Sequence, residues 1–221
     1  SFLVQTNYQI PMDPPNRRAV ANLLKEAEQK GRQTAGKTVD NISDNGKPGV
    51  NCETSELISK AIAEASNSQV VFHGTLSDKD LEKGKVTYHD LFDLIPYENG
   101  IMTCLLTPAE LMGIIEEQYD KRKTSASCGL WGIKAVLSSE TGKVLKLQMP
   151  DGSQLPNRLK TAVNSYTAAG GGGRFPVLRK ILNKKSSRLK DTNISSREAV
   201  ADYFRKHSPV KIDCREWLSI K

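Results

Sequence analysis

Apolar side chains recur at helical spacing in several segments of the chain. In residues 19–29 the stripe consists of Val20, Leu23, Leu24 and Ala27, and prolines precede it. A proline just ahead of such a stripe is typical of a helix start. Similar spacing returns in residues 53–65, 107–119 and 176–183. We therefore expect an amphipathic helix in each of these segments.

Helix-start signals add two further helices and sharpen one boundary. The segment Thr107–Glu110 is a capping box with Pro108 at the first helical position. A second capping box, Ser195–Glu198, precedes the run AVADYFRKH and predicts a final helix. Thr87 precedes the short apolar run LFDLI, and Pro96 follows it. This pattern predicts a helix of one or two turns.

Short apolar runs between the helices predict strands at SQVVF (68–72), GIMTCLL (100–106) and LKTAVNSY (159–166). The runs WGIKAVLSS and KVLKLQM flank Glu-Thr-Gly at 140–142, which indicates a hairpin. Helices and strands therefore mix without strict βαβ alternation. We expect an α+β (mixed α/β) layered domain rather than a Rossmann fold or a barrel.

Length and composition favour one globular domain. The chain has 221 residues, of which 38% are hydrophobic and 26% charged. It has no apolar run of eighteen residues, and its opening SFLVQTNYQI lacks the features of a signal peptide. Because the chain begins with Ser, we interpret it as a fragment or processed product. Residues 1–11 are expected to be a linker or leader, and residues 12–221 the domain.

The net charge of +7 is concentrated locally between residues 174 and 190. Seven basic residues and no acid lie there: Arg174, Arg179, Lys180, Lys184, Lys185, Arg188 and Lys190. Such a run could attract a polyanion or an acidic protein surface. It has no interleaved aromatic residues and no nucleic-acid motif, so nucleic-acid binding is disfavoured. A solvated helix face explains the run better.

No self-contained catalytic centre is visible in the sequence. The chain lacks GxSxG, HExxH and P-loop motifs, and its three histidines lie far apart, so we expect them to be caps or surface residues. The four cysteines are Cys52, Cys104, Cys128 and Cys214, and none has a ligand-spaced neighbour. We interpret them as small buried side chains, and the even number leaves disulfides open. No metal site is expected within this chain.

The run NSYTAAGGGGRF (164–175) places four glycines beside an aromatic residue. Consecutive glycines have a high entropic cost on folding, so a flexible spacer is one interpretation. The other is that the backbone must approach a flat ligand or another chain closely. Tyr97, which follows Pro96 in PYEN, is a second tyrosine beside irregular backbone. Both tyrosines could also simply cover the core.

Several stretches resemble the C-terminal domain of 5'-nucleotidases. GKVTYHDLFDLIPYENGIMTCLLTPAELMGIIEE (84–117) is similar to the family pattern G-x-V-T-Y-x-D-L, P-F-G-N and L-T-G-x-x-L. AVNSYTAAGGGGRF is similar to the family's N-x-F/Y-x-x-x-G-G-D loop, and SCGLWGIKAV to its Ser-Gly turn. The tail SSREAVADYFRKHSPV resembles its closing helix. Order and spacing agree over residues 12–221.

The resemblance implies an α/β/β/α layered domain that follows a metallophosphoesterase domain. In that family the upstream domain binds two metals and hydrolyses the phosphate ester, while the C-terminal domain holds the nucleoside. Two aromatic rings sandwich the base, which assigns Tyr97 and Tyr166 to stacking. Asn99, Gly129 and Gly171 occupy further substrate-binding positions. The resemblance implies no catalytic residue and no cofactor in this chain.

Several positions depart from the family pattern, among them Gly172 and Asp78. Gly172 stands where the family has an Asp that accepts hydrogen bonds from the ribose, and Asp78 stands where it has a phosphate-binding Arg. We therefore expect nucleoside or nucleotide recognition with an altered ribose and phosphate site. The alternative is a non-enzymatic module that docks a partner on the same fold. The family usually acts in the periplasm or at the cell surface.

Overall fold

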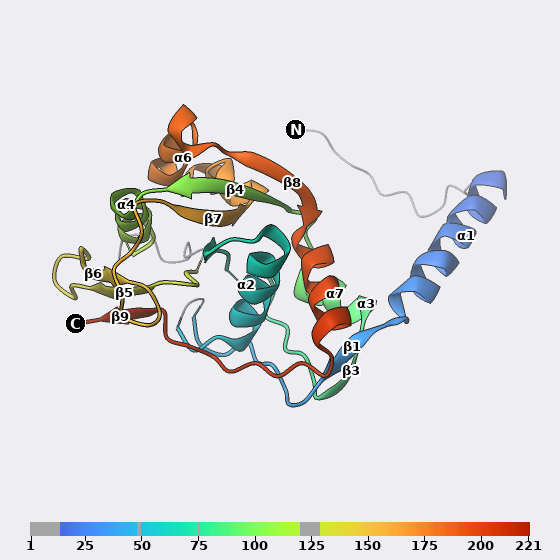
Figure 1. The fold of residues 1–221 in the computed structure, drawn as a ribbon. Helices are drawn as coiled ribbons and strands as arrows, with labels where there is room; N and C mark the ends of the chain where they lie inside the picture. The colour runs from blue at the N-terminus through green and yellow to red at the C-terminus, as the bar shows by residue number, and fades with distance from the viewer. Residues whose placement is uncertain (1–13, 48–49, 75, 120–128) are drawn as a thin grey trace.

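The computed structural model describes residues 14–47, 50–74, 76–119 and 129–221 (Figure 1). Two short 3-10 turns, Gly171–Gly173 and Lys185–Ser187, accompany the helices and strands. The helices are α1 (Pro14–Gly31), α2 (Glu53–Ser66), α3 (Tyr88–Leu94), α4 (Pro108–Gln118), α5 (Ser165–Ala168), α6 (Pro176–Leu182) and α7 (Ser196–His207). The strands are β1 (Thr34–Thr38), β2 (Val70–Phe72), β3 (Gly84–Thr87), β4 (Gly100–Leu106), β5 (Lys134–Leu137), β6 (Val144–Gln148), β7 (Leu159–Asn164), β8 (Lys190–Ser195) and β9 (Leu218–Ile220).

A four-stranded sheet in the order β2-β7-β4-β8 forms the centre of the domain. Strand β4 runs antiparallel to both of its neighbours, and β2 runs parallel to β7. A second sheet has the order β6-β5-β9, and β1 pairs with β3 as a small ribbon. The predicted hairpin at 140–142 is confirmed, because β5 and β6 pair in antiparallel register.

The two faces of the central sheet bury different cores. Val71, Ile101 and Ala162 pack in the core that contains α2 and α7. Their neighbours in sequence, including Val70 and Val163, pack in a second core with α4, α6 and the β5-β6 hairpin. This alternation follows from the two-residue period of a strand. Figure 1 shows α2 and α6 on opposite sides of β4 and β7. The predicted layered, mixed α/β class is confirmed.

Each predicted helix and strand has a counterpart in the structure, with boundaries that differ by a few residues. The strand predicted over 159–166 ends at Asn164, and Tyr166 lies in the single-turn helix α5. The side chain of Asn164 accepts a hydrogen bond from the Thr167 amide at 2.7 Å, so it caps that turn. Strands β1, β3 and β8 were not predicted, because their short polar sequences look like loops.

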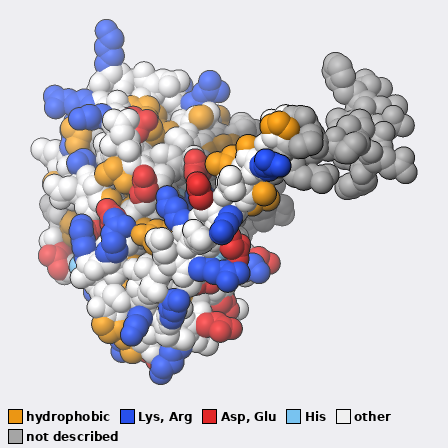
Figure 2. Space-filling model, turned by 90° about the vertical axis from the view of Figure 1, so that its right-hand side faces the viewer, with side chains coloured by type: hydrophobic (Ala, Val, Ile, Leu, Met, Phe, Trp, Pro, Cys, Tyr) orange, Lys and Arg blue, Asp and Glu red, His pale blue; other side chains and the backbone are white. Residues whose placement is uncertain are grey.

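Helix α1 projects from the body of the domain (Figure 1). Leu23 and Leu24 on its apolar stripe are 64% and 65% exposed, and Figure 2 shows hydrophobic side chains along this projection. Near its end, Glu28 Oε2 lies 3.6 Å from His89 Nε2 of α3. The division into a leader over 1–11 and a domain over 12–221 stays a prediction. Across the described part of the chain, no helix has the length and apolar character to cross a membrane.

A buried carboxylate joins α2 to the second sheet. Glu56 is almost fully buried, and its two oxygens accept hydrogen bonds from the indole N–H groups of Trp131 (2.9 Å) and Trp217 (2.7 Å). Lys60 Nζ lies 3.5 Å from one of these oxygens. Trp131 precedes β5, and Trp217 precedes β9. A buried charge is tolerated only when it is hydrogen-bonded or paired, and this one is both.

We predict that Glu56→Gln lowers the free energy of unfolding. The amide would turn an N–H₂ donor toward one indole N–H, and that buried donor would lose its acceptor. Losing charge-assisted bonds of this kind should reduce stability by about 2 to 4 kcal/mol. Urea unfolding followed by tryptophan fluorescence measures the loss. Glu82→Gln, on an exposed residue, is the matched control, and equal stability of the two variants would contradict the assigned role of Glu56.

Candidate functional site

Four segments meet at one end of the central sheet. Ile101 at the start of β4 pairs with Asn164 at the end of β7, and Gly100 pairs with Ser195 at the end of β8. Strand β2 runs parallel to β7, so its final residue, Phe72, lies at the same end. The entry loop of β4 therefore lies beside the exits of three neighbouring strands.

The predicted site residues belong to these segments. Tyr97 and Asn99 lie just before β4, whereas Tyr166 and Gly171 follow β7. Trp131 pairs antiparallel with Val71 of β2, so the segment that precedes Trp131, where Gly129 lies, runs toward the end of that strand. The topology thus gathers all five predicted substrate-binding positions at one sheet end.

Backbone contacts tie this end together. The Asn99 carbonyl accepts a hydrogen bond from the Ser196 amide at 2.9 Å, and Ser196 is the first residue of α7. The Ser196 hydroxyl lies 3.3 Å from His73 Nε2, and His73 Nδ1 lies 2.6 Å from the Gly74 carbonyl. A carbonyl only accepts, so Nδ1 carries the proton and Nε2 accepts from the hydroxyl.

His73 is a structural residue of the site. It is completely buried, and burial lowers its pKa to about 4. The expectation that the histidines are caps or surface residues is therefore wrong for His73, whereas His89 and His207 are exposed. Within the ranges that the structure describes, no group of three or more His, Cys, Asp or Glu residues could hold a metal ion.

Both candidate stacking rings are accessible. Tyr97 is 61% exposed and Tyr166 is 48% exposed, so neither tyrosine simply covers the core. Next to Tyr97, Glu98 Oε1 lies 3.3 Å from Arg197 Nη1. Arg197 also donates from Nε to the Ile95 carbonyl at 2.9 Å, which fixes this ion pair against the loop before β4.

The four consecutive glycines all have positive φ. The φ angles of Gly170, Gly171, Gly172 and Gly173 are 96°, 55°, 67° and 90°. A Cβ on Gly171 would lie 2.5 Å from the ring of Phe175, and a Cβ on Gly172 would lie 3.1 Å from the Tyr166 hydroxyl. The glycines therefore form a tightly folded loop against the tyrosine, and the spacer interpretation does not describe them.

Arg174 joins this loop to Tyr166. Its Nη2 donates to the Tyr166 hydroxyl at 3.1 Å, and its Nε donates to the Gly171 carbonyl at 2.8 Å. The guanidinium carbon lies 5.5 Å from the centroid of the Tyr166 ring, which is cation–π distance. The sequence alone indicates only that Arg174 belongs to a basic run. The sequence signal for its contact with the tyrosine is a basic residue directly after glycines and near an aromatic residue.

The loop is anchored at its far end by Glu117 of α4. This buried carboxylate accepts hydrogen bonds from the Val177 amide at 2.6 Å and the Leu178 amide at 3.0 Å, in the first turn of α6. Phe175, which precedes the helix, is also buried. The carboxylate satisfies amides that the helix itself leaves free. The shape of the glycine loop therefore depends on α4 as well as on its own sequence.

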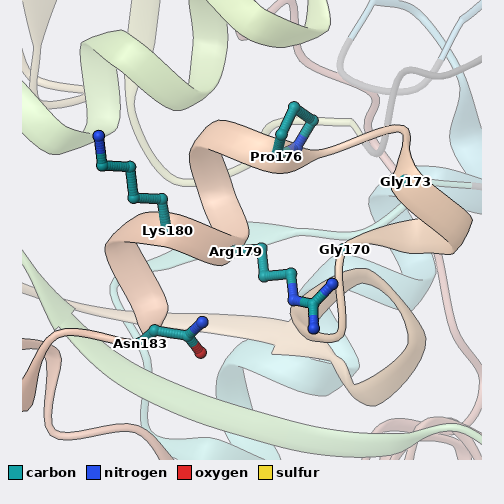
Figure 3. A pocket seen from close by; sticks show the side chains of 6 residues that line it. All are labelled: Gly170, Gly173, Pro176, Arg179, Lys180 and Asn183. Carbon is teal, nitrogen blue, oxygen red and sulfur yellow. The ribbon is translucent and has the colours of Figure 1, made fainter.

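An open pocket of about 330 Å³ lies between the glycine loop and α6 (Figure 3). Its lining consists of Gly170, Gly173, Pro176, Arg179, Lys180 and Asn183. Figure 3 shows the Arg179 side chain extending toward Gly170. Neither candidate stacking tyrosine lines this pocket. Arg179 and Lys180 give it positive charge beside exposed loop backbone.

The basic run, the described cysteines and Asp78, which the sequence also pointed to, lie outside the candidate stacking site or on the surface. All seven basic residues of 174–190 are exposed, as a solvated face requires, and Lys184 pairs with Glu110 at 3.1 Å. Cys52 and Cys104 are buried and Cys214 is half-buried, and all three are free thiols. Cys128 lies outside the described residues. Asp78 is exposed in the segment that follows β2.

We predict that Gly171→Ala lowers the free energy of unfolding more than Gly173→Ala does. Both substitutions place a side chain at positive φ, but only the first forces a Cβ against the buried Phe175 ring. Backbone strain costs about 1 to 3 kcal/mol at either position. The clash should add to that cost at residue 171 alone. Urea denaturation of both variants measures the difference, and equal losses would show that Phe175 does not constrain the loop.

Comparison with known proteins gives the family. The family model described as "5'-nucleotidase, C-terminal domain" matches residues 29–180. A protein named "Probable 5'-nucleotidase" from Treponema pallidum (strain Nichols) is 28% identical over 142 residues, which cover 58% of this chain and 23% of that protein.

Two solved structures share the fold. The 5'-nucleotidase precursor from Thermus thermophilus has a TM-score of 0.71 at 16% identity, covering 95% of this chain and 44% of that one. The NAD nucleotidase of Haemophilus influenzae has a TM-score of 0.62 at 16% identity, covering 95% and 42%. This chain thus spans less than half the length of each relative. The family match extends over more than half of the chain, and the chain belongs to the 5'-nucleotidase C-terminal domain family.

Proposed function

We propose that this chain is the substrate-recognition domain of a 5'-nucleotidase-like metallophosphoesterase and holds a nucleoside or nucleotide between Tyr97 and Tyr166. One observation carries the proposal. The central sheet brings two accessible tyrosines from separate segments to the same end, beside a glycine loop folded against one of them. A flat base needs two ring faces and close backbone, and this end offers both.

Arg174 determines where a base can stack on Tyr166. Its guanidinium covers one face of that ring, so the base would contact the opposite face. The hydrogen bond from Arg174 to the Tyr166 hydroxyl keeps the ring in one orientation. A ring that is already ordered loses less entropy when it binds a ligand. Arg174 would thus support stacking without contacting the base.

The affinity of the isolated domain should be weak. Stacking on an aromatic side chain contributes about 1 to 3 kcal/mol per base face. Two tyrosines therefore supply about 2 to 6 kcal/mol, and a millimolar dissociation constant already needs about 4 kcal/mol. Gly172 has no side chain that could accept from the ribose, and Asp78 has the wrong charge to bind phosphate. We expect a dissociation constant in the millimolar range.

Catalysis belongs to an upstream domain in this proposal. A metallophosphoesterase domain preceding this chain would hold the divalent metals and hydrolyse the phosphate ester, while this domain selects the substrate. The lengths of the relatives support such an arrangement, because this chain covers less than half of each. Because members of this family usually act in the periplasm or at the cell surface, we propose the same location for this protein.

A partner-docking module is the second candidate. The seven basic side chains of 174–190 are all exposed and could contact an acidic protein surface. This function becomes the leading one if the tyrosines bind no base.

A ligand-detected NMR titration tests the clamp. We expect saturation transfer from the domain to the purine protons of adenosine and AMP, and a loss of that transfer in both Tyr97→Ala and Tyr166→Ala. A sugar phosphate without a base should give much weaker transfer. Leu145→Ala is the matched control, because Leu145 of β6 is as exposed as Tyr97 but lies on the second sheet. Transfer that is absent for all three ligands, or unchanged in both tyrosine variants, would contradict the clamp.

We predict that Gly172→Asp strengthens adenosine binding about tenfold, because it adds a carboxylate that can accept from the ribose. The backbone at this position, with φ 67° and ψ 30°, is a conformation that Asp tolerates. Gly172→Ala adds the same Cβ without an acceptor and is the control. NMR titration with adenosine gives both dissociation constants. If the Asp variant binds no more tightly than the Ala variant, residue 172 does not face the sugar.

A further inference from the structure

The open pocket between the glycine loop and α6 is rich in hydrogen-bond donors (Figure 3). Arg179, Lys180 and Asn183 line it from α6 and the C-cap of that helix, and Gly170 and Gly173 line it from the loop. The guanidinium and ammonium groups only donate hydrogen bonds, and the Asn183 amide can donate two. A ligand of this pocket therefore has to be rich in hydrogen-bond acceptors.

The two cations of the pocket have no counter-ion in the part of the chain that the structure describes. There, the side chains of Arg179 and Lys180 form neither an ion pair nor a hydrogen bond. By contrast, Lys184, four residues after Lys180, pairs with Glu110. The carboxylate of Glu117 is buried and already accepts from two amides of α6. Positive charge that is not neutralised nearby attracts small anions.

The glycine loop leaves backbone accessible beside these cations. A Cβ on Gly170 would lie 3.0 Å from Arg179 Cδ, so a larger residue there would press on that side chain. A Cβ on Gly173 would have no heavy atom of the described residues within 4 Å. A ligand can therefore approach the loop backbone closely at Gly173, which is one of the uses of glycine at binding sites.

A phosphate group suits this set of donors better than a carboxylate does. The donors belong to three different side chains, and phosphate presents oxygens in several directions whereas a carboxylate presents two in one plane. A guanidinium can bind phosphate through two hydrogen bonds, and an ammonium adds a point charge. The volume of about 330 Å³ is at the lower end of the range for small-molecule sites. The pocket thus has room for a small anion.

We propose that this pocket binds a phosphate dianion between Arg179, Lys180 and the glycine loop. The proposal does not depend on the base clamp, because neither Tyr97 nor Tyr166 lines the pocket. Free inorganic phosphate and the phosphate group of an ester share the required chemistry. Because the pocket is open and its cations are exposed, solvent and salt screen the attraction. We therefore expect a dissociation constant in the millimolar range for inorganic phosphate.

Chemical-shift mapping with sodium phosphate tests the site. The ¹⁵N-labelled chain is titrated at about pH 8, where phosphate is largely a dianion, and sodium chloride holds the ionic strength constant. We expect saturable shifts that are concentrated on the amides of the glycine loop and α6. Shifts there that do not saturate, or that sodium chloride reproduces without phosphate, would overturn the proposal.

Two double variants of equal net charge separate the pocket from the general charge of the basic run. Arg179→Gln with Lys180→Gln should weaken phosphate binding about tenfold or more. Lys185→Gln with Arg188→Gln removes the same charge from exposed residues that do not line the pocket, and should weaken it less than about twofold. Equal weakening in both would overturn the proposal. If the first double variant fails to fold, judged by circular dichroism, Arg179→Gln alone decides.

AMP distinguishes the two sources of the phosphate group. It is titrated into Tyr97→Ala, which lacks one candidate stacking ring, with and without the substitutions at Arg179 and Lys180. Shifts on α6 that require both cations would assign the site to phosphate esters as well as to the free ion. Shifts with inorganic phosphate alone would assign it to the free ion. Failure of the base clamp would leave the inorganic phosphate titration unchanged, so the two proposals can fail separately.

Discussion

The pairing of β4 between β7 and β8 is the constraint on which the rest of the structure depends. Because β4 is antiparallel to both neighbours, its entry loop must lie beside their exits. The same register sends Ile101 into one core and Cys104 into the other. A slip of one residue would exchange these faces, so the register is strongly specified. The packing of the core therefore determines the geometry of the candidate site.

Buried carboxylates connect the parts that the sheet does not hold by itself. Glu56 joins α2 to the two tryptophans that precede β5 and β9, and Glu117 joins α4 to the start of α6. Each oxygen of both groups accepts a hydrogen bond, which is the condition for keeping a charge buried. The second of these connections fixes one end of the glycine loop. Local loop geometry and distant helix packing are therefore coupled.

Much of the fold could be predicted from sequence, because its signals are local. The capping boxes at Thr107 and Ser195 start α4 and α7 as expected. Strand β8 could not be recognised, because an edge strand with the sequence KDTNIS exposes polar side chains as a loop does. The small strands β1 and β3 depend on pairing with each other rather than on apolar runs.

The candidate site could be predicted only through family resemblance and in outline. The shared sheet end of Tyr97 and Tyr166 follows from strand order. The burial of His73 depends on tertiary packing, and no sequence pattern indicates it. The contact of Arg174 with Tyr166 also depends on packing, and its position after the glycines is the one sequence signal for it.

The central claim is that a base occupies the space between the two tyrosines. A crystal of this chain soaked in millimolar adenosine tests it most directly. The account predicts electron density for the purine ring between Tyr97 and Tyr166, on the face of Tyr166 away from Arg174. Empty tyrosine rings, or adenosine bound only in the pocket beside Arg179, would contradict the account.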